Sequence, residues 1–310
     1  MKILIISPTI LKERSGRFDF LSQVFRKFGH EVYLIPKDQW KKFYFAYLKF
    51  KPDVLISVGV IAVLPTILKK MKLIPTVHVH DWNDDYTDVM GSKYGIDRIA
   101  FMEHYIIKNA DYITTPSKFL QRKCEIFGKT AFYIPHGVDP KIDNTKPIKL
   151  DGDIKIVYAG SQSRYKMVDK LVEAVRGLNC ELYLIGKSNP ELRKIASVNV
   201  HFVGLVKHEK VFSYFKAADI LVITSDDDST LKMFEYIRIG KPILALKGRV
   251  GYLLDNYVNA LLVDDLKEGI KLLLENKKMR TTLSKNVKKI KTCTWEEIGI
   301  KYLELLGRVT

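Results

Sequence analysis

The feature of the sequence that most constrains its fold is a short apolar run, rich in β-branched residues, that recurs between segments of helical length. The chain starts with KILIIS at residues 2–7, continues through the helical pattern RFDFLSQVFRKFG and reaches a second run, HEVYLIP, at 30–36. The same plan returns later, where IKIVYAG restates the first run and CELYLIG restates the second. Short apolar strands that alternate with helices are typical of parallel sheets covered on both faces. The sequence therefore predicts an α/β protein with two doubly wound, Rossmann-like sheets.

The domain boundaries follow from a break in this pattern. Residues 139–153 are polar, carry two prolines and interrupt the periodicity, so we interpret them as a linker. We expect an N-terminal domain over residues 1–145 and a C-terminal domain over 146–292, with an amphipathic helix at 293–310 that packs back toward the N-terminal domain. Open α/β sheets bind ligands at the carboxyl ends of their strands, so two facing domains predict an interdomain cleft.

The balance of charge predicts an anionic partner. The 310 residues include 51 Lys and Arg against 35 Asp and Glu, a formal net charge of +16. A nucleotide, an acidic membrane face and a nucleic acid all fit this charge. The three cysteines have no CxxC or Cys/His spacing, which argues against a disulfide framework and a zinc site. No apolar run approaches the length of a membrane span, and the first residues are typical of a strand rather than a signal peptide, so we expect a cytoplasmic protein.

Several residues could bind phosphate, although the GxGxxG fingerprint and the Walker A pattern are both missing. Gly16 directly precedes a predicted helix and would let backbone amides approach a phosphate. Arg164 and Lys166 follow the strand that ends near Gly160, where two cations beside a helix N-terminus suit a diphosphate. A plain turn glycine and a solvated basic loop remain open as alternatives.

An acidic stretch, ITSDDDSTLKMFEYIRIGKPILA at residues 223–245, follows a predicted strand in this basic chain. Asp227 ends the loop, Ser229 and Thr230 can cap the helix that follows, and Glu235 lies in its second turn. A carboxylate is a natural acceptor for two vicinal hydroxyls, as in a ribose, while a helix N-terminus receives phosphates. One helix could therefore hold both parts of a nucleoside diphosphate.

Four further motifs, in order along the chain, give this pattern a family resemblance. They are SGRFDFLSQVFRKFGHEV, ADYITTPSKFLQRKC, YIPHGVDP and KMFEYIRIGKPILA. Together they resemble the retaining glycosyltransferases of family 4 (glycosyl transferases group 1), which have the GT-B fold. The resemblance covers nearly the whole chain, and the combination of motifs is highly specific.

The resemblance implies a role for each candidate residue. Glu235 would bind the donor ribose, and Asp227 and His80 would face the transferred sugar, while Lys166 would bind the diphosphate and Arg164 would stand in for a displaced arginine. The implied donor-binding residues are Gly16, Arg164, Lys166, Ser229, Thr230, Leu231 and Glu235. The implied catalytic residues are His80, Asp227, Lys166 and Arg164.

The resemblance implies a retaining hexosyltransferase that uses a UDP-, GDP- or ADP-sugar and an acceptor hydroxyl, without a metal or another cofactor. A β-phosphate oxygen would take the acceptor proton. Two positions depart from the family pattern: Asp227 is one methylene shorter than the usual glutamate, and His136 replaces an asparagine. A nucleotide-sugar epimerase on the same fold and a non-catalytic nucleotide-sugar-binding protein remain alternatives.

Two patterns could indicate metal binding instead. His78 and His80 form a His-x-His pair, but no third ligand is apparent in the sequence. The aspartates at 226–228 resemble the Asp-x-Asp metal clamp of GT-A enzymes. The GT-A fold has one nucleotide-binding sheet, whereas this chain repeats its sheet, so no metal site is predicted.

The segment DQWKKFYFAYLKFKPD at residues 38–53 interleaves aromatic residues with lysines. As a helix it is apolar nearly all round with lysines at its margins, which favours an anionic membrane surface. The residues expected to contact the membrane are Trp40, Lys41, Lys42, Phe45, Leu48 and Lys49. A core helix is the alternative, and nucleic acid is disfavoured because no binding motif accompanies the segment. The acceptor is then expected to be a lipid or a glycan at the inner face of the plasma membrane, and the oligomeric state stays open.

Overall fold

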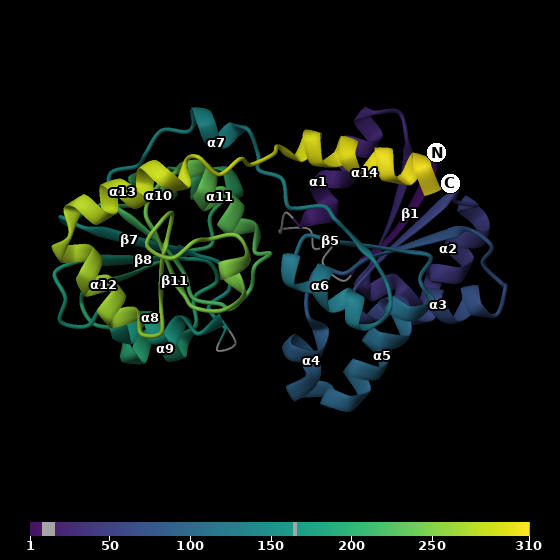
Figure 1. Ribbon diagram of the computed structural model, residues 1–310, viewed down its shortest axis with the longest axis horizontal. Coiled ribbons are helices and arrows are strands. Elements are labelled where there is room, and N and C mark those ends of the chain that lie inside the picture. Colours follow the sequence, from purple (N-terminus) through teal and green to yellow (C-terminus); the bar gives the residue numbers. More distant parts are fainter. Residues whose placement is uncertain (8–15, 164–165, 310) are drawn as a thin grey trace. The chain divides into compact units, whose positions relative to one another are not determined.

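The structure is a computed structural model that describes residues 1–7, 16–163 and 166–309. The chain forms two compact units (Figure 1). The first unit combines Met1–Gly137 with Cys293–Thr310, and the second is Val138–Thr292. The first unit is therefore discontinuous in sequence, whereas the second is a single continuous stretch.

The strands of the first unit are β1 (Lys2–Ser7), β2 (Glu31–Pro36), β3 (Val54–Val58), β4 (Val77–Asp81), β5 (Tyr112–Thr115) and β6 (Ala131–Tyr133). Its helices are α1 (Arg17–Lys27), η1 (Lys37–Lys42), α2 (Phe43–Phe50), η2 (Val60–Ala62), α3 (Val63–Lys70), α4 (Tyr86–Tyr94), α5 (Ile96–Asn109), α6 (Lys118–Ile126) and α14 (Trp295–Val309). Within the described ranges, the strands form one parallel sheet in the order β2-β1-β3-β4-β5-β6. The predicted strands KILIIS and HEVYLIP are thus neighbours in this sheet.

Helices cover both faces of this first sheet because its strands are apolar on both sides. On one face, Leu4 and Ile6 of β1 pack with Phe43 and Tyr47 of α2. On the other face, α1 and α14 lie against each other (Figure 1). There the ring of Tyr302 contacts phenylalanines of α1. The apolar residues at helical spacing in the C-terminal segment are therefore the buried stripe of α14.

The strands of the second unit are β7 (Lys155–Ala159), β8 (Glu181–Ile185), β9 (Val200–Gly204), β10 (Ile220–Ile223), β11 (Ile243–Leu246) and β12 (Leu261–Val263). Its helices are α7 (Lys141–Asn144), α8 (Val168–Ala174), α9 (Pro190–Ile195), α10 (His208–Ala217), α11 (Leu231–Ile239), η4 (Arg249–Tyr252), α12 (Leu266–Glu275) and α13 (Lys277–Val287). For the described residues the sheet order is β12-β11-β10-β7-β8-β9, again parallel throughout. This is the Rossmann order, and its direction reverses between β7 and β10.

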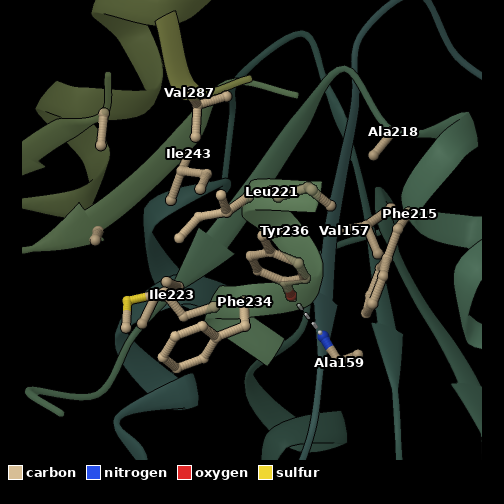
Figure 2. Close-up of a cluster of buried hydrophobic side chains, with 14 of the residues drawn as sticks. Val157, Ala159, Phe215, Ala218, Leu221, Ile223, Phe234, Tyr236, Ile243 and Val287 are labelled. Atoms are coloured by element: carbon tan, nitrogen blue, oxygen red, sulfur yellow. Dashed lines mark hydrogen bonds between the residues drawn. The ribbon is translucent and has the colours of Figure 1, made fainter. Parts of the chain in front are cut away.

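The core beneath α11 fixes that helix on the second sheet. Figure 2 shows Phe234 and Tyr236 of α11 among Val157 of β7, Leu221 of β10 and other buried side chains. The Tyr236 hydroxyl accepts a hydrogen bond of 3.3 Å from the Ala159 amide, at the end of β7 (Figure 2). The middle of α11 therefore packs on both strands that flank the reversal of strand order.

The boundary between the units follows Gly137, whereas the sequence predicts it after residue 145. The intervening segment joins the second unit because it has partners there. Ile142 of α7 is buried in the core of the second sheet, and Asp143 forms an ion pair with Arg238 of α11. The segment interpreted as a linker thus contains a short helix that packs on the second unit.

Candidate functional site

The two loops that follow β7 and β10 meet at the carboxyl edge of the second sheet, where the strand order reverses. The Lys166 Nζ lies 3.9 Å from the Asp227 Oδ2, and the Thr224 hydroxyl donates to the Lys166 carbonyl. Crevices at such reversals are where open α/β sheets bind ligands. Arg164, the other predicted cation of the first loop, lies outside the described residues.

The three consecutive aspartates have separate contacts. Asp226 pairs with Arg249, whose Nε lies 3.2 Å from its Oδ2. Asp227 accepts hydrogen bonds of 2.9 Å from both the amide and the hydroxyl of Ser229 at Oδ1. Asp228 is buried, with 1% of its surface exposed. The acidic run is therefore held by its own loop and by two cations.

Metal binding was the alternative for these aspartates and for the His-x-His pair. Within the ranges that the structure describes, no group of three or more His, Cys, Asp or Glu residues could hold a metal ion. Metal independence stays a prediction that activity measurements must test.

Helix α11 begins without a side-chain cap from the residue at its N-cap. Thr230 occupies that position, and its side chain makes no capping hydrogen bond, contrary to the sequence prediction. The Thr230 Oγ1 and the Ser225 Oγ are buried atoms without a hydrogen-bond partner in the described part of the chain. Leu231 is the first residue of the helix. The Thr230 hydroxyl thus lies at a helix N-terminus, where backbone amides favour an anion.

Glu235 lies in the second turn of α11 and has a partner that the sequence did not reveal. The His208 Nε2 lies 2.9 Å from the Glu235 Oε1, and the glutamate is only 6% exposed. Burial disfavours the imidazolium of His208, but the hydrogen bond and the charge of Glu235 outweigh it and raise the pKa of His208. His208 is the first residue of α10, and no motif marks it. The carboxylate is therefore oriented by an imidazole from a neighbouring helix.

Lys232 is a second residue of this edge that the sequence analysis missed. Its Nζ lies 4.0 Å from the centre of the Tyr158 ring, so the side chain reaches from α11 to the end of β7. Burial, together with the charge of Lys166, lowers the pKa of Lys232 to about 7, and Asp227 opposes the shift. In the sequence, Lys232 stands between Leu231 and Met233, and no motif or spacing marks it as a binding residue.

Gly16 and His80 were assigned to the same site and lie in the first unit. Gly16 is the N-cap of α1, and its amide donates to the Asp19 Oδ2 at 2.7 Å. Its φ of −96° is open to any residue, so the turn itself does not require glycine. Burial raises the pKa of Asp19 although the Gly16 amide opposes the shift. The amide that was predicted to approach a phosphate is thus engaged within its own helix turn.

His80 is buried at the carboxyl end of β4, beside His78. The Ser57 hydroxyl lies 2.7 Å from the His78 Nε2 and 3.1 Å from the His80 Nδ1. Burial lowers the pKa of each imidazole to about 3, so both are neutral near pH 7. His80 is almost fully buried and therefore carries no positive charge near pH 7.

A buried ion pair on the opposite face of β4 connects this strand with α1, β5, α14 and the loop after β6. The Arg17 Nε lies 3.3 Å from the Asp81 Oδ2, and the guanidinium also donates to the carbonyls of Ile134 and Pro135. Thr114 of β5 and Tyr302 of α14 donate to the same carboxylate oxygen. The network fixes α1 and α14 on the sheet.

His136, the second departure from the family pattern, lies beside this network. Its Nδ1 is 3.5 Å from the Arg17 NH1, and its ring contacts Trp295 edge-on. His136 thus packs between α1 and α14 within the first unit.

The segment predicted to contact a membrane has two different faces. Phe43 and Tyr47 of α2 are buried in the core, which matches the alternative interpretation of one aromatic core face. The opposite face is exposed, with Trp40 at 40%, Phe45 at 77% and Leu48 at 48% of their surface. The exposed lysines beside them are Lys41, Lys42 and Lys49. None of the helices within the described ranges combines the length and the apolar character needed to cross a bilayer.

The sequence resembles known glycosyltransferases, and the family match lies in the second unit. Residues 153–276 match the family model described as Glycosyl transferases group 1. An uncharacterized glycosyltransferase of Methanocaldococcus jannaschii is 26% identical in an alignment of 209 residues, which covers 62% of this chain. That match spans 58% of the relative, so the chain covers less than two thirds of its length.

Solved structures resemble the whole chain. Anabaena Alr3699/HepE, solved in complex with UDP and glucose, has a TM-score of 0.77 at 16% identity and covers 99% of both chains. A putative UDP-N-acetylglucosamine 2-epimerase from Listeria monocytogenes has a TM-score of 0.65 at 14% identity, covering 98% of this chain and 95% of its own. These matches confirm the predicted α/β, two-domain GT-B fold. The predicted cleft between facing domains stays a prediction.

Proposed function

We propose that the protein is a glycosyltransferase that moves a sugar from a UDP-, GDP- or ADP-sugar to an acceptor hydroxyl, with retention of anomeric configuration. One observation carries the proposal. Lys166 and Asp227 meet where the strand order of the second sheet reverses, and Glu235 follows in the second turn of α11, all within the segment that matches glycosyl transferases group 1. Family-4 membership and retention come from the motif resemblance alone.

The donor would bind along α11. The helix N-terminus at Leu231 and the ammonium of Lys166 supply positive charge for the diphosphate, and the unpartnered hydroxyl of Thr230 adds a donor. Glu235 would accept the ribose hydroxyls about one turn further on. His208 holds the Oε1 of that glutamate, so the carboxylate is already oriented when the ribose arrives.

The chemistry that we propose needs no side chain as a base. The acceptor hydroxyl attacks the anomeric carbon on the face from which the diphosphate departs, and a β-phosphate oxygen takes its proton. Lys166 and the start of α11 stabilise the negative charge that develops on the leaving group, which is the largest contribution expected from a protein site. His80, neutral near pH 7, would hydrogen-bond the transferred sugar without adding charge.

The acceptor that we propose is a lipid or a glycan presented at the cytoplasmic face of a membrane. The exposed face of η1 and α2, with Trp40, Phe45 and Leu48 among three lysines, supports this assignment. Aromatic and aliphatic side chains enter the interface while lysines pair with anionic headgroups. The formal net charge of +16 strengthens the same attraction.

Nucleotide binding is the first test of the proposal. Calorimetry and thermal shift with UDP, GDP, ADP and their sugar conjugates, with EDTA present, should give tight binding of one nucleotide. Glu235→Ala should weaken that binding at least tenfold, or about 1.4 kcal/mol, whereas the exposed Glu268→Ala on α12 should leave it unchanged. Failure of every nucleotide to bind would refute the proposal.

Two observations favour alternatives that the same protein can test. The fold match to the Listeria epimerase keeps nucleotide-sugar epimerisation open, and an epimerase would convert the donor without any acceptor. The engagement of Asp227 by Ser229 and Lys166 fits a non-catalytic binding protein. Such a protein would bind the nucleotide sugar and turn nothing over, with or without acceptors. Proton NMR of the donor over time distinguishes all three.

A further inference from the structure

Lys232 stands out because it places a cation where a helix disfavours one. It is the second residue of α11, and the macrodipole makes the N-terminal turn of a helix unfavourable for positive charge. Its ammonium contacts the Tyr158 ring. It forms no hydrogen bond and no ion pair with any of the described residues. A half-buried ammonium without a hydrogen-bond acceptor destabilises the fold. A ligand that pairs with this ammonium would offset the destabilisation.

The position of the Lys232 ammonium points to the diphosphate part of the proposed donor site. A Cβ built on Gly160, which ends the strand–loop junction after β7, would lie 3.5 Å from the Lys232 Nζ. The side chain therefore reaches from α11 to the start of the β7–α8 loop, at the reversal of strand order. Lys166 approaches the same edge from the β7–α8 loop and lies 3.9 Å from Asp227. Two ammonium groups thus border one anion-binding edge.

The charges around Lys232, at the carboxyl edge of the second sheet, favour the binding of an anion. The charged and titratable groups that act on Lys232 are Lys166, Asp227 and Tyr158. Of these, Asp227 is the one carboxylate, and Ser229 and Lys166 already engage it. The Tyr158 hydroxyl donates to the Ser161 carbonyl, and the Tyr236 hydroxyl accepts from Ala159. Lys232 therefore has no carboxylate of its own to pair with among the described residues.

We propose that Lys232 is a second cation of the diphosphate site and pairs with the diphosphate oxygens together with Lys166. This inference rests on the proposed function, because it assumes a nucleoside diphosphate at this edge. Burial and the charge of Lys166 lower the pKa of Lys232 in the free protein to about 7. A bound diphosphate favours the ammonium, so binding draws a proton from solution, and affinity for the diphosphate falls as the pH rises above about 7.

Calorimetry of UDP, GDP and ADP, with the matching nucleosides, tests the assignment across about pH 6.5 to 9 in two buffers of different ionisation enthalpy. The wild type should bind one diphosphate with net proton uptake, and its Kd should rise up to about tenfold per pH unit above pH 7. Lys232→Met should weaken the diphosphate about 10- to 100-fold at pH 7, with little dependence on pH and an unchanged affinity for the nucleoside. Lys271→Met, an exposed lysine of α12, is the matched control and should behave as the wild type.

Lys232→Arg separates the charge from the packing of this side chain. Arginine stays charged throughout this pH range, so the variant should bind the diphosphate tightly and without proton uptake. It also decides the question if Lys232→Met does not fold. Lys232→Met with wild-type affinity, or Lys232→Arg with the wild-type pH dependence, would overturn the assignment and leave the proposed function intact. A wild type that binds none of the diphosphates would overturn both.

Discussion

Removal of the buried guanidinium of Arg17 should destabilise the first unit strongly and in a pH-dependent way. Both partners of the ion pair are almost fully buried, with side-chain exposures of 2% for Arg17 and 0% for Asp81. Arg17→Met would leave the carboxylate of Asp81 without its counter-charge, which costs about 3–5 kcal/mol when a buried pair is broken from one side. The carbonyls of Ile134 and Pro135 would also lose their donor, and each unsatisfied group costs about 1–3 kcal/mol.

The pH dependence identifies the charge as the cause. Burial already raises the pKa of Asp81, and the loss of Arg17, which opposes that shift, would raise it further. A carboxyl with a raised pKa in the folded state contributes stability that is present at low pH and is lost as the pH rises. The difference between Arg17→Met and the wild type should therefore be largest near pH 8 and shrink toward about 2–6 kcal/mol near pH 4, where the loss of the two carbonyl bonds remains.

Tryptophan fluorescence during urea unfolding measures this difference in the first unit alone. The three tryptophans, Trp40, Trp82 and Trp295, all belong to that unit. Arg26→Met is the matched control, because Arg26 lies on the exposed side of the same helix. A destabilisation below about 1 kcal/mol, or one that is equal at both ends of the pH range, would refute the reasoning.

Three further predictions concern packing, charge and the exposed face. Gly299→Ala should lower the free energy of unfolding of the first unit by about 1–2 kcal/mol. The added Cβ would lie 2.4 Å from a side chain of α1, and this clash outweighs the gain in helix propensity. An unchanged midpoint of urea unfolding would contradict this prediction. His208→Gln should lower the calorimetric Tm more at about pH 6 than at about pH 8, because a base with a raised pKa stabilises the fold at low pH; an equal shift would argue against the ion pair with Glu235. Phe45→Ser combined with Leu48→Ser should reduce binding to liposomes with anionic lipid about tenfold or more and leave nucleotide affinity unchanged. Equal liposome binding would remove the membrane assignment.

The strands were predictable because each is an apolar run bounded by turn residues, and the alternation with helices determines a parallel sheet. The boundary near Gly137 could not be predicted. Ile142 and Asp143 lie in a polar segment typical of a linker, and only the structure shows their partners in the second unit. The segment at residues 38–53 was expected to be one helix and forms η1 followed by α2, with a buried and an exposed face.

The site was predictable only to the extent that its residues form local motifs. Asp227 and Glu235 share one loop and one helix, so their spacing is visible in the sequence. The partners of this loop and helix are not visible, because Arg249 and His208 come from other elements and have no characteristic spacing to the acids. Lys232 was missed for a different reason: its reach to Tyr158 depends on how α11 lies on the sheet.

The discontinuity of the first unit has a consequence for the order in which the protein acquires its structure during synthesis. Residues 138–292 form a continuous unit that can fold as soon as it has left the ribosome. Synthesis of the first unit starts earlier, but two of its contacts can form only after α14 has been made. These are the hydrogen bond from Tyr302 to the Asp81 carboxylate and the stacking of Trp295 on Phe20. The half of the protein that is translated first is therefore the last to be completed, and until then the surface of α1 that α14 covers is exposed to chaperones and proteases.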